Sequence, residues 1–265
     1  MKAIEARLRR EIGLDAASVG TSLIERTIRL RMKGLGVETP EAYLALLLTS
    51  RSEWEELIEA VVVSETWFFR DAAAFTEGVR WVQSESAGHS GAGPVRVLCV
   101  PCASGEEPYS LAMALLDAGV PPERFALHAV DLSARALARA GAGTYGKNSF
   151  RGPSLEFRNR HFSPSRAGFK LHDRVRKLVT FQPGNLLADD FRPGAAPYDL
   201  IFCRNLLIYF DDVSRRQAAE MFYEALSPGG FICLGHSESM SRMSSLFMPR
   251  KFADALVYQK SPQHP

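Results

Sequence analysis

Residues 96–110 read Arg-Val-Leu-Cys-Val-Pro-Cys-Ala-Ser-Gly-Glu-Glu-Pro-Tyr-Ser, and they carry the strongest structural signal in the chain. Residues 95–100 are rich in valine and leucine and predict a buried strand. Ser104 and Gly105 predict a tight turn, and residues 106–117 predict a helix. A strand that ends in a small-residue turn and opens a helix is how doubly wound sheets bring backbone amides to a cofactor. We therefore expect an α/β fold with a cofactor site at this turn.

Two acids, Glu106 and Glu107, stand where a phosphate-binding loop favours glycine or lysine. They would repel a pyrophosphate group, so a cationic or zwitterionic cofactor fits the turn better. S-adenosylmethionine, which carries an ammonium and a sulfonium charge, meets that description. The sequence alone leaves open which of the two acids faces the cofactor.

The composition argues against several classes of protein. A net charge of +2 over 265 residues is too small to predict nucleic-acid binding by itself. No apolar run is long enough to cross a bilayer and the N-terminus lacks a signal-peptide pattern, so we expect a cytoplasmic protein without membrane insertion. Cys99 and Cys102 form a CxxC pair, but they fall in and after a strand and lack a second pair at metal-ligand spacing. The four cysteines are therefore expected to be core residues, and no metal is expected.

The first part of the chain, residues 1–70, predicts a helical domain. Apolar residues recur at helical spacing in two stripes, which consist of Ile4, Leu8 and Ile12, and of Leu23, Ile24, Thr27, Leu30 and Leu35. Thr39 before Pro40 predicts the start of another helix. Residues 71–94 are expected to form a connecting helix, 71–83, and a linker, 84–94, that is rich in serine, glycine and alanine.

The remaining chain, residues 95–265, alternates strands with helices. We predict strands at 125–130, 198–203 and 230–235, helices at 133–140 and 212–226, and a closing hairpin within 252–259. Such alternation favours a largely parallel, Rossmann-like sheet with helices on both faces and a ligand beyond the carboxyl ends of its strands. Residues 145–180 interrupt the alternation and are strongly basic. They predict a small β insert in which 168–172 and 177–181 form short paired strands.

Polar residues follow several of the predicted strands. Asp131 ends the second strand, where an acid accepts hydrogen bonds from ribose hydroxyls; it could instead cap a helix, although Ser133 can fill that position. Asn185, followed by Leu186, could contact an adenine or simply form a turn. Arg204 and Asn205 end the strand at 198–203, and Tyr209 follows within one turn.

The segment Ser64-Glu-Thr-Trp-Phe-Phe-Arg70 joins the two parts. Three aromatic residues in a row are ordinary core residues, and the arginine could extend to water. A position between two domains is also where ligands bind, which favours a functional role for Arg70.

Five linked motifs resemble those of the CheR family of chemoreceptor methyltransferases, and they occur in the same order and at spacing compatible with that family. They are Glu65–Arg70, Ser104–Ser110, Asn185–Leu187, Phe202–Asn205 with Ile208–Asp211, and Gly235–Glu238. The match covers nearly the whole chain, and residues 12–20 and 59–63 are similar to the Wsp branch, which is tied to surface sensing.

The resemblance implies transfer of a methyl group from S-adenosylmethionine to glutamate side chains of a receptor's cytoplasmic helical bundle, with a methylesterase as the functional counterpart. It implies a cofactor site formed by Thr66, Arg70, Glu107, Asp131, Asn185, Leu186, Arg204 and Asn205, with Glu106 as the alternative acid. Arg70 and Tyr209 are implied to lie nearest the reactive methyl group. Ser64 stands where many relatives have asparagine, so its contact is left open.

Three further interpretations remain at this point. Arg26, Arg29 and Lys33 share one helical face, which is either a solvated face or a docking surface for an acidic receptor bundle. His236 is expected to belong to a loop that covers the site, because ester formation at glutamate moves no proton. Alternative functions are a non-catalytic S-adenosylmethionine-binding regulatory module, or a methyltransferase that acts on RNA or a small molecule.

Overall fold

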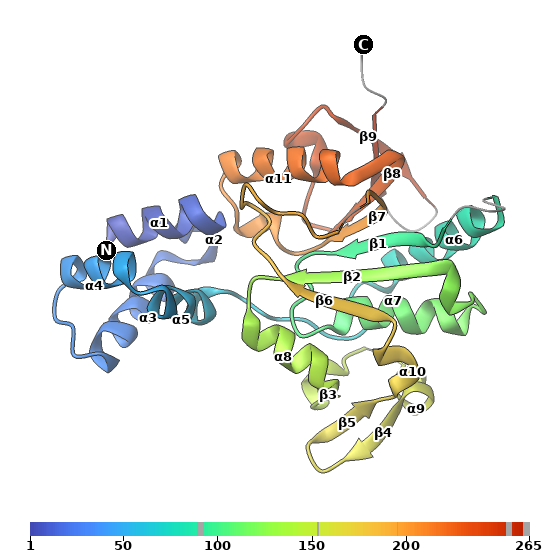
Figure 1. Cartoon of the computed structure of the whole chain (residues 1–265), viewed down its shortest axis with the longest axis horizontal. Coiled ribbons are helices and arrows are strands. Elements are labelled where there is room, and N and C mark those ends of the chain that lie inside the picture. Colours follow the sequence, from blue (N-terminus) through green and yellow to red (C-terminus); the bar gives the residue numbers. More distant parts are fainter. Residues whose placement is uncertain (89–92, 153, 195, 253–255, 262–265) are drawn as a thin grey trace.

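The computed structural model describes residues 1–88, 93–152, 154–194, 196–252 and 256–261. Five helices come first and lie together beside a larger sheet region (Figure 1). They are α1 (Lys2–Ile12), α2 (Ala16–Val19), α3 (Thr21–Gly34), α4 (Pro40–Thr49) and α5 (Arg51–Val61). Their buried apolar side chains form a hydrophobic cluster separate from those of the sheet region.

The helical part follows the predicted pattern with one error. The Thr39 side chain accepts a hydrogen bond from the backbone nitrogen of Ala42, which confirms the predicted cap of α4. In α3 the buried residues are Ile24, Ile28 and Met32, four residues apart on one face. The predicted stripe is correct at Ile24 but wrong at Leu23, Leu30 and Leu35, which are exposed.

A seven-stranded sheet forms the centre of the larger region, in the order β6-β2-β1-β7-β8-β10-β9. Its strands are β1 (Val95–Cys99), β2 (Phe125–Asp131), β6 (Val179–Pro183), β7 (Tyr198–Cys203), β8 (Leu226–Leu234), β9 (Phe247–Lys251) and β10 (Leu256–Lys260). The first five pair in parallel, and β10 pairs antiparallel with β8 and β9. The predicted final hairpin is present, but its first strand ends before Phe252, and residues 253–255 lie outside the described residues.

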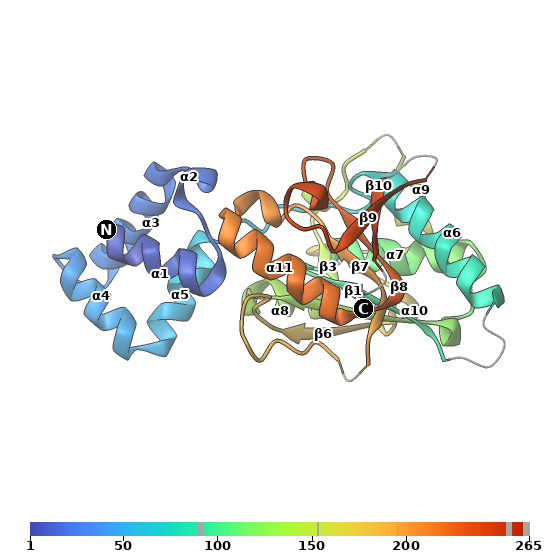
Figure 2. The same ribbon diagram turned by 90° about the horizontal axis from the view of Figure 1, so that it is seen from above.

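Helices cover both faces of this sheet, as predicted (Figure 2). Alternate side chains of β1 point to opposite faces: Val97 and Cys99 join the cluster that includes α6 (Ala72–Gly88) and α7 (Glu106–Asp117). Leu98 joins the opposite cluster, which includes α11 (Asp212–Ala225). A further helix, α8 (Ala134–Ala142), packs on β2 and β6.

The strand order places the switch point between β1 and β7. The chain runs from β1 outward to β2 and β6, then returns to β7 on the other side of β1 and continues to β8. In sheets of this kind, the loops after the two strands at the switch point diverge and leave room for a ligand. The helical domain lies at this end of the sheet (Figure 1).

The basic insert forms a second, three-stranded antiparallel sheet with the order β3-β5-β4. It comprises β3 (Thr144–Tyr145), η2 (Lys147–Ser149), α9 (Glu156–His161), β4 (Phe162–Ser165), β5 (Gly168–Leu171) and α10 (Asp173–Arg176). The predicted pairing of 168–172 with 177–181 was wrong. β5 pairs with β3 and β4, whereas β6 joins the main sheet in parallel with β2.

The connection between the two parts is also more helical than predicted. Helix α6 continues to Gly88, five residues past the expected end at Gln83. The remainder of the predicted linker includes residues 89–92, which lie outside the described residues.

Candidate functional site

A cavity of about 750 Å³, counting its open side, lies where the helices meet the carboxyl ends of the strands. One wall comes from the helical domain and the segment after it, with Ile12, Leu14 and residues 62–64. The other wall comes from loops that follow the parallel strands. It contains five of the residues predicted for the site, namely Asp131, Asn185, Leu186, Asn205 and Tyr209.

Asp131 ends β2 at the floor of this cavity. Its carboxylate accepts hydrogen bonds from the backbone nitrogens of Ala103, at 2.7 Å, and Ser133, at 2.8 Å. Burial raises its pKa above the ordinary aspartate value. Ser133 caps α8 by accepting from the backbone nitrogen of Ala136, so the cap prediction for Ser133 is confirmed and Asp131 faces the cavity.

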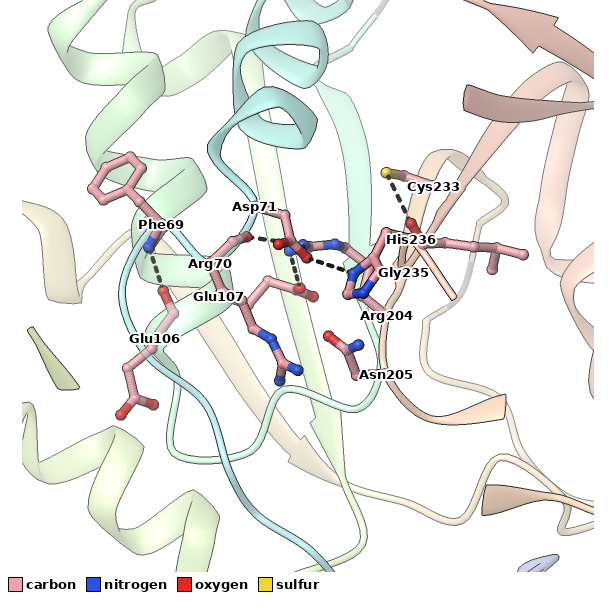
Figure 3. A network of polar contacts seen from close by, with 12 residues as sticks. Phe69, Arg70, Asp71, Glu106, Glu107, Arg204, Asn205, Cys233, Gly235 and His236 are labelled. Atoms are coloured by element: carbon pink, nitrogen blue, oxygen red, sulfur yellow. Dashed lines mark hydrogen bonds and ion pairs between the residues drawn. The ribbon is translucent and has the colours of Figure 1, made fainter. Parts of the chain in front are cut away.

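The adjacent acids Glu106 and Glu107 point in different directions (Figure 3). Both carboxylate oxygens of Glu106 accept hydrogen bonds from hydroxyl groups, those of Ser104 and Ser149, each at 2.8 Å. Glu107 accepts one hydrogen bond, from Arg204, and its Oε1 is buried without a partner among the described residues. Burial raises the pKa of both carboxyl groups.

Arg204, at the end of β7, is buried between two acids. Its Nη1 donates to Glu107 at 3.0 Å, and its Nη2 donates to the Asp71 carboxylate at 2.7 Å and to the backbone oxygen of Arg70 at 2.8 Å (Figure 3). Within the part of the chain that is described, its Nε is buried and has no hydrogen-bond partner. An unpaired buried donor and an unpaired buried acceptor, Glu107 Oε1, therefore occur together in this network.

Unusual backbone conformations gather around the same network. The described non-glycine residues with positive φ are Phe69, Asp71, Ala103 and Asn205, with φ between 45° and 58°. Such conformations cost energy and recur at functional sites. Two of them flank Arg70, and a hydrogen bond from the Phe69 backbone nitrogen to the Ser110 hydroxyl, at 2.9 Å, ties this segment to α7.

Arg70 itself is half-buried. Its guanidinium donates to the backbone oxygen of Glu65 at 3.1 Å and lies 4.5 Å from the centre of the Trp67 ring. Figure 3 shows Arg70, Glu107 and Asn205 facing the same space. Thr66 lies half-buried in the same segment.

The amide of Asn185 links the two walls of the cavity. Its Nδ2 donates to the backbone oxygen of Glu11 at 2.6 Å, and its Oδ1 accepts from the backbone nitrogen of Leu187 at 3.1 Å. A second link is formed by Glu59 of α5, which accepts from the Ser133 hydroxyl at 2.6 Å. The helical domain thus contacts residues directly beside the predicted cofactor positions.

Sequence reasoning assigned no role to Glu238, although it closes one of the motifs. Its buried carboxylate accepts hydrogen bonds from the backbone nitrogens of Asn205, Leu206, Leu207 and Gly235, at 2.7 to 2.9 Å. It therefore holds the loop that joins Arg204 to Tyr209. Asp71 was also missed. It binds Arg204, and its Oδ2 lies 3.5 Å from Nδ1 of His236, an exposed residue of the segment that follows β8.

The predicted docking residues lie on α3, away from this cavity. Arg26, Arg29 and Lys33 line a shallow hollow together with the exposed Leu30. Arg29 approaches Glu25 at 3.8 Å, which is a weak surface contact. Arg31, on the same helix, is half-buried and forms ion pairs with Glu53 and Glu56 of α5.

The structure also bears on metal binding and on membrane insertion. All four cysteines are buried with free thiols. The described residues contain no group of three or more histidine, cysteine or acidic side chains that could hold a metal ion. Among the described helices, none combines the length and apolar character that a bilayer crossing requires.

Two family models cover most of the chain. Residues 64–255 match "CheR methyltransferase, SAM binding domain", and residues 1–62 match "CheR methyltransferase, all-alpha domain".

Individual relatives agree with these matches. The chain is 43% identical, over 98% of its length, to "Probable biofilm formation methyltransferase WspC" of Pseudomonas aeruginosa, and 41% identical, over 95%, to the protein of the same name from Pseudomonas putida. It spans only 62% and 59% of the lengths of these two relatives. It is 39% identical, over 80% of its length, to "Chemotaxis protein methyltransferase 2" of Vibrio cholerae and covers 74% of that protein.

Proposed function

Because the chain belongs to the CheR methyltransferase family, we propose that it transfers methyl groups from S-adenosylmethionine to glutamate side chains of a methyl-accepting receptor. The products would be glutamyl methyl esters. The names of the two Pseudomonas relatives support a further assignment, to a receptor system that controls biofilm formation or responds to surfaces.

The main observation behind this proposal is that two buried atoms of the network have no hydrogen-bond partner. Glu107 Oε1 is an acceptor and Arg204 Nε is a donor, and both lack partners among the residues described. Burying a polar atom without a hydrogen-bond partner costs free energy, so such atoms indicate that a bound ligand supplies the missing partners. The methionine part of the cofactor offers the matching groups, an ammonium donor for Glu107 and a carboxylate acceptor for Arg204.

Other residues fit the remainder of the same ligand. Asp131 retains free lone pairs on a buried carboxylate that faces the cavity, as a pair of ribose hydroxyls would require. Leu186 offers an apolar surface, and the second N–H of Asn185 remains for an adenine edge. Glu106, whose oxygens are both engaged by serine hydroxyls, is assigned a structural role, and Thr66 is retained as a contact of the cofactor.

When bound, S-adenosylmethionine supplies a methyl group on a positively charged sulfur. A substrate glutamate has an ordinary pKa of about 4.3, so at neutral pH it is already a nucleophile and needs no base. The protein's task is to align that carboxylate and exclude water, which contributes up to about 7–11 kcal/mol in favourable cases. Tyr209, which lines the cavity, and Arg70 are proposed to position the incoming carboxylate.

The partner is proposed to be the cytoplasmic helical bundle of the receptor, which places the reaction in the cytoplasm. Arg26, Arg29 and Lys33, with Leu30 between them, provide a basic surface with an apolar centre for an acidic helix. A methylesterase that removes the ester would complete the adaptation cycle.

The test uses purified protein, S-adenosylmethionine with a labelled methyl group, and the cytoplasmic fragments of candidate receptors. Label should appear on receptor glutamates and should be released by mild alkali, as expected of an ester. Peptide mass spectrometry then identifies the modified residues. Label that resists alkali, or label on RNA or a small molecule in its place, would refute glutamate as the substrate.

A further inference from the structure

A second hollow, of about 830 Å³ with its open side, lies beside the loop that carries Tyr209. Its walls come from Leu207 and Ile208 of η3 (Leu207–Tyr209), from the first turn of α11, and from residues 237–243. Ile208 precedes Tyr209 directly, so this hollow lies close to the proposed reaction site.

Five charged side chains line the hollow, and three of them, Glu238, Arg215 and Asp212, have hydrogen-bond or ion-pair partners within the protein. Glu238 uses both carboxylate oxygens to accept backbone hydrogen bonds, as described above. Arg215 pairs with Asp212 at 3.1 Å and donates to the backbone oxygen of Leu207 at 2.9 Å.

The other two charged side chains are Arg216 and Arg242. Both are exposed, and neither has an ion pair or a hydrogen bond to any of the residues that the structure describes. They come from different elements, α11 and η4 (Met240–Arg242), and converge on one hollow. Arg216 and Arg242 are therefore the cations of the lining whose side chains lack a partner among the described residues, and the five charged side chains of the lining sum to one positive charge.

We propose that Arg216 and Arg242 form an acid-binding subsite for side chains that neighbour the modified glutamate on the receptor helix. This rests on the proposed function, and it names which flanking sequence the enzyme selects. On a helix, residues three and four positions apart lie on one face, about 5–6 Å apart, so a glutamate at the reaction site brings its neighbours to the adjacent hollow. Guanidinium groups pair well with carboxylates, and exposed charges of this kind govern encounter and substrate selection.

The experiment is steady-state kinetics with the cytoplasmic fragment of a receptor that the unaltered protein methylates. In the double variant R216E/R242E, KM for the receptor fragment should rise roughly tenfold at low salt, with kcat unchanged, and the difference should shrink as salt is raised. A matched control is K2E/K177E, which changes the net charge equally at two exposed lysines remote from the hollow. Calorimetric affinity for S-adenosylhomocysteine should be unchanged in both variants, which shows that they are folded.

A KM that rises no more in R216E/R242E than in K2E/K177E would overturn the subsite. So would a fall in kcat at unchanged KM, because a subsite for flanking residues alters binding and not the transfer step. In contrast, absence of ester formation by the unaltered protein with any receptor would refute the proposed function itself, and the subsite with it.

Discussion

Replacing Glu107 with glutamine should weaken binding of S-adenosylmethionine while leaving the fold intact. The substitution preserves shape but removes the negative charge opposite the ammonium group of the proposed ligand. Hydrogen bonds to charged groups contribute about 1.5–3 kcal/mol, and about 1.4 kcal/mol corresponds to a factor of ten. We therefore expect the dissociation constant to rise roughly 10- to 150-fold.

The adjacent acid provides the control for this experiment. Glu106 is also buried at the start of α7, but its oxygens are occupied by Ser104 and Ser149. Glu106→Gln should therefore change the affinity much less than Glu107→Gln. Isothermal titration calorimetry with S-adenosylhomocysteine measures both, and thermal unfolding shows that each variant is folded.

The same reasoning predicts how affinity depends on pH. Burial raises the pKa of Glu107, so its carboxylate takes up a proton at a higher pH than an ordinary glutamate does. Because the charged form binds the ammonium, affinity should fall on acidification starting above the ordinary glutamate range, and Glu107→Gln should remove this dependence. Equal affinities for the two glutamine variants, or a larger loss in Glu106→Gln, would refute the assignment of Glu107.

Three further perturbations test other parts of the site. Asp131→Asn should weaken S-adenosylhomocysteine binding about tenfold in calorimetry, and unaltered affinity would contradict this. Both carboxylate oxygens of Asp131 accept a backbone hydrogen bond, from Ala103 and Ser133, and an amide cannot accept both of these bonds and also serve a ribose. Glu238→Gln should lower the free energy of unfolding by about 2–4 kcal/mol in urea titration, since several backbone donors lose a charged acceptor, whereas the exposed control Glu224→Gln should not; equal stabilities would exclude the clamping role. Reversing Arg26 and Arg29 to glutamate should reduce affinity for the receptor fragment roughly tenfold at low salt in a binding titration, and unchanged binding would leave α3 as a solvated face.

The sequence predicted the parts of the fold in which local pattern and long-range packing agree. Residues 95–100 and 198–203 are mostly apolar because both of their faces are covered by helices, and such strands are easily recognised. Edge strand β6 was misassigned because Thr180 and Gln182 are exposed, so its composition resembles a surface hairpin. Its parallel partner β2 lies about fifty residues earlier, and local pattern does not reveal such a pairing.

The same distinction applies to the site. Positions at strand ends predicted three residues of the site, Asp131, Arg204 and Asn205, because the topology brings the carboxyl ends of the parallel strands to one edge of the sheet. Asp71 was missed because its contact with Arg204 spans 133 residues and depends on a left-handed backbone. The sequence could not separate Glu106 from Glu107, since the difference depends on Ser149, forty-three residues away from Glu106.

The contacts between the two walls of the cavity bear on how the proposed reaction would turn over. Under the proposed function S-adenosylhomocysteine must leave after every transfer, and the hydrogen bonds from Asn185 to Glu11 and from Ser133 to Glu59 hold the helical domain beside the residues proposed to bind it. In α3, the helix proposed to dock the receptor, Arg31 forms ion pairs with Glu53 and Glu56 of α5, and α5 also carries Glu59. Docking of the receptor on α3, as proposed above, would therefore act on the same helical domain that borders the cavity, so that receptor release and cofactor exchange would involve the same contacts.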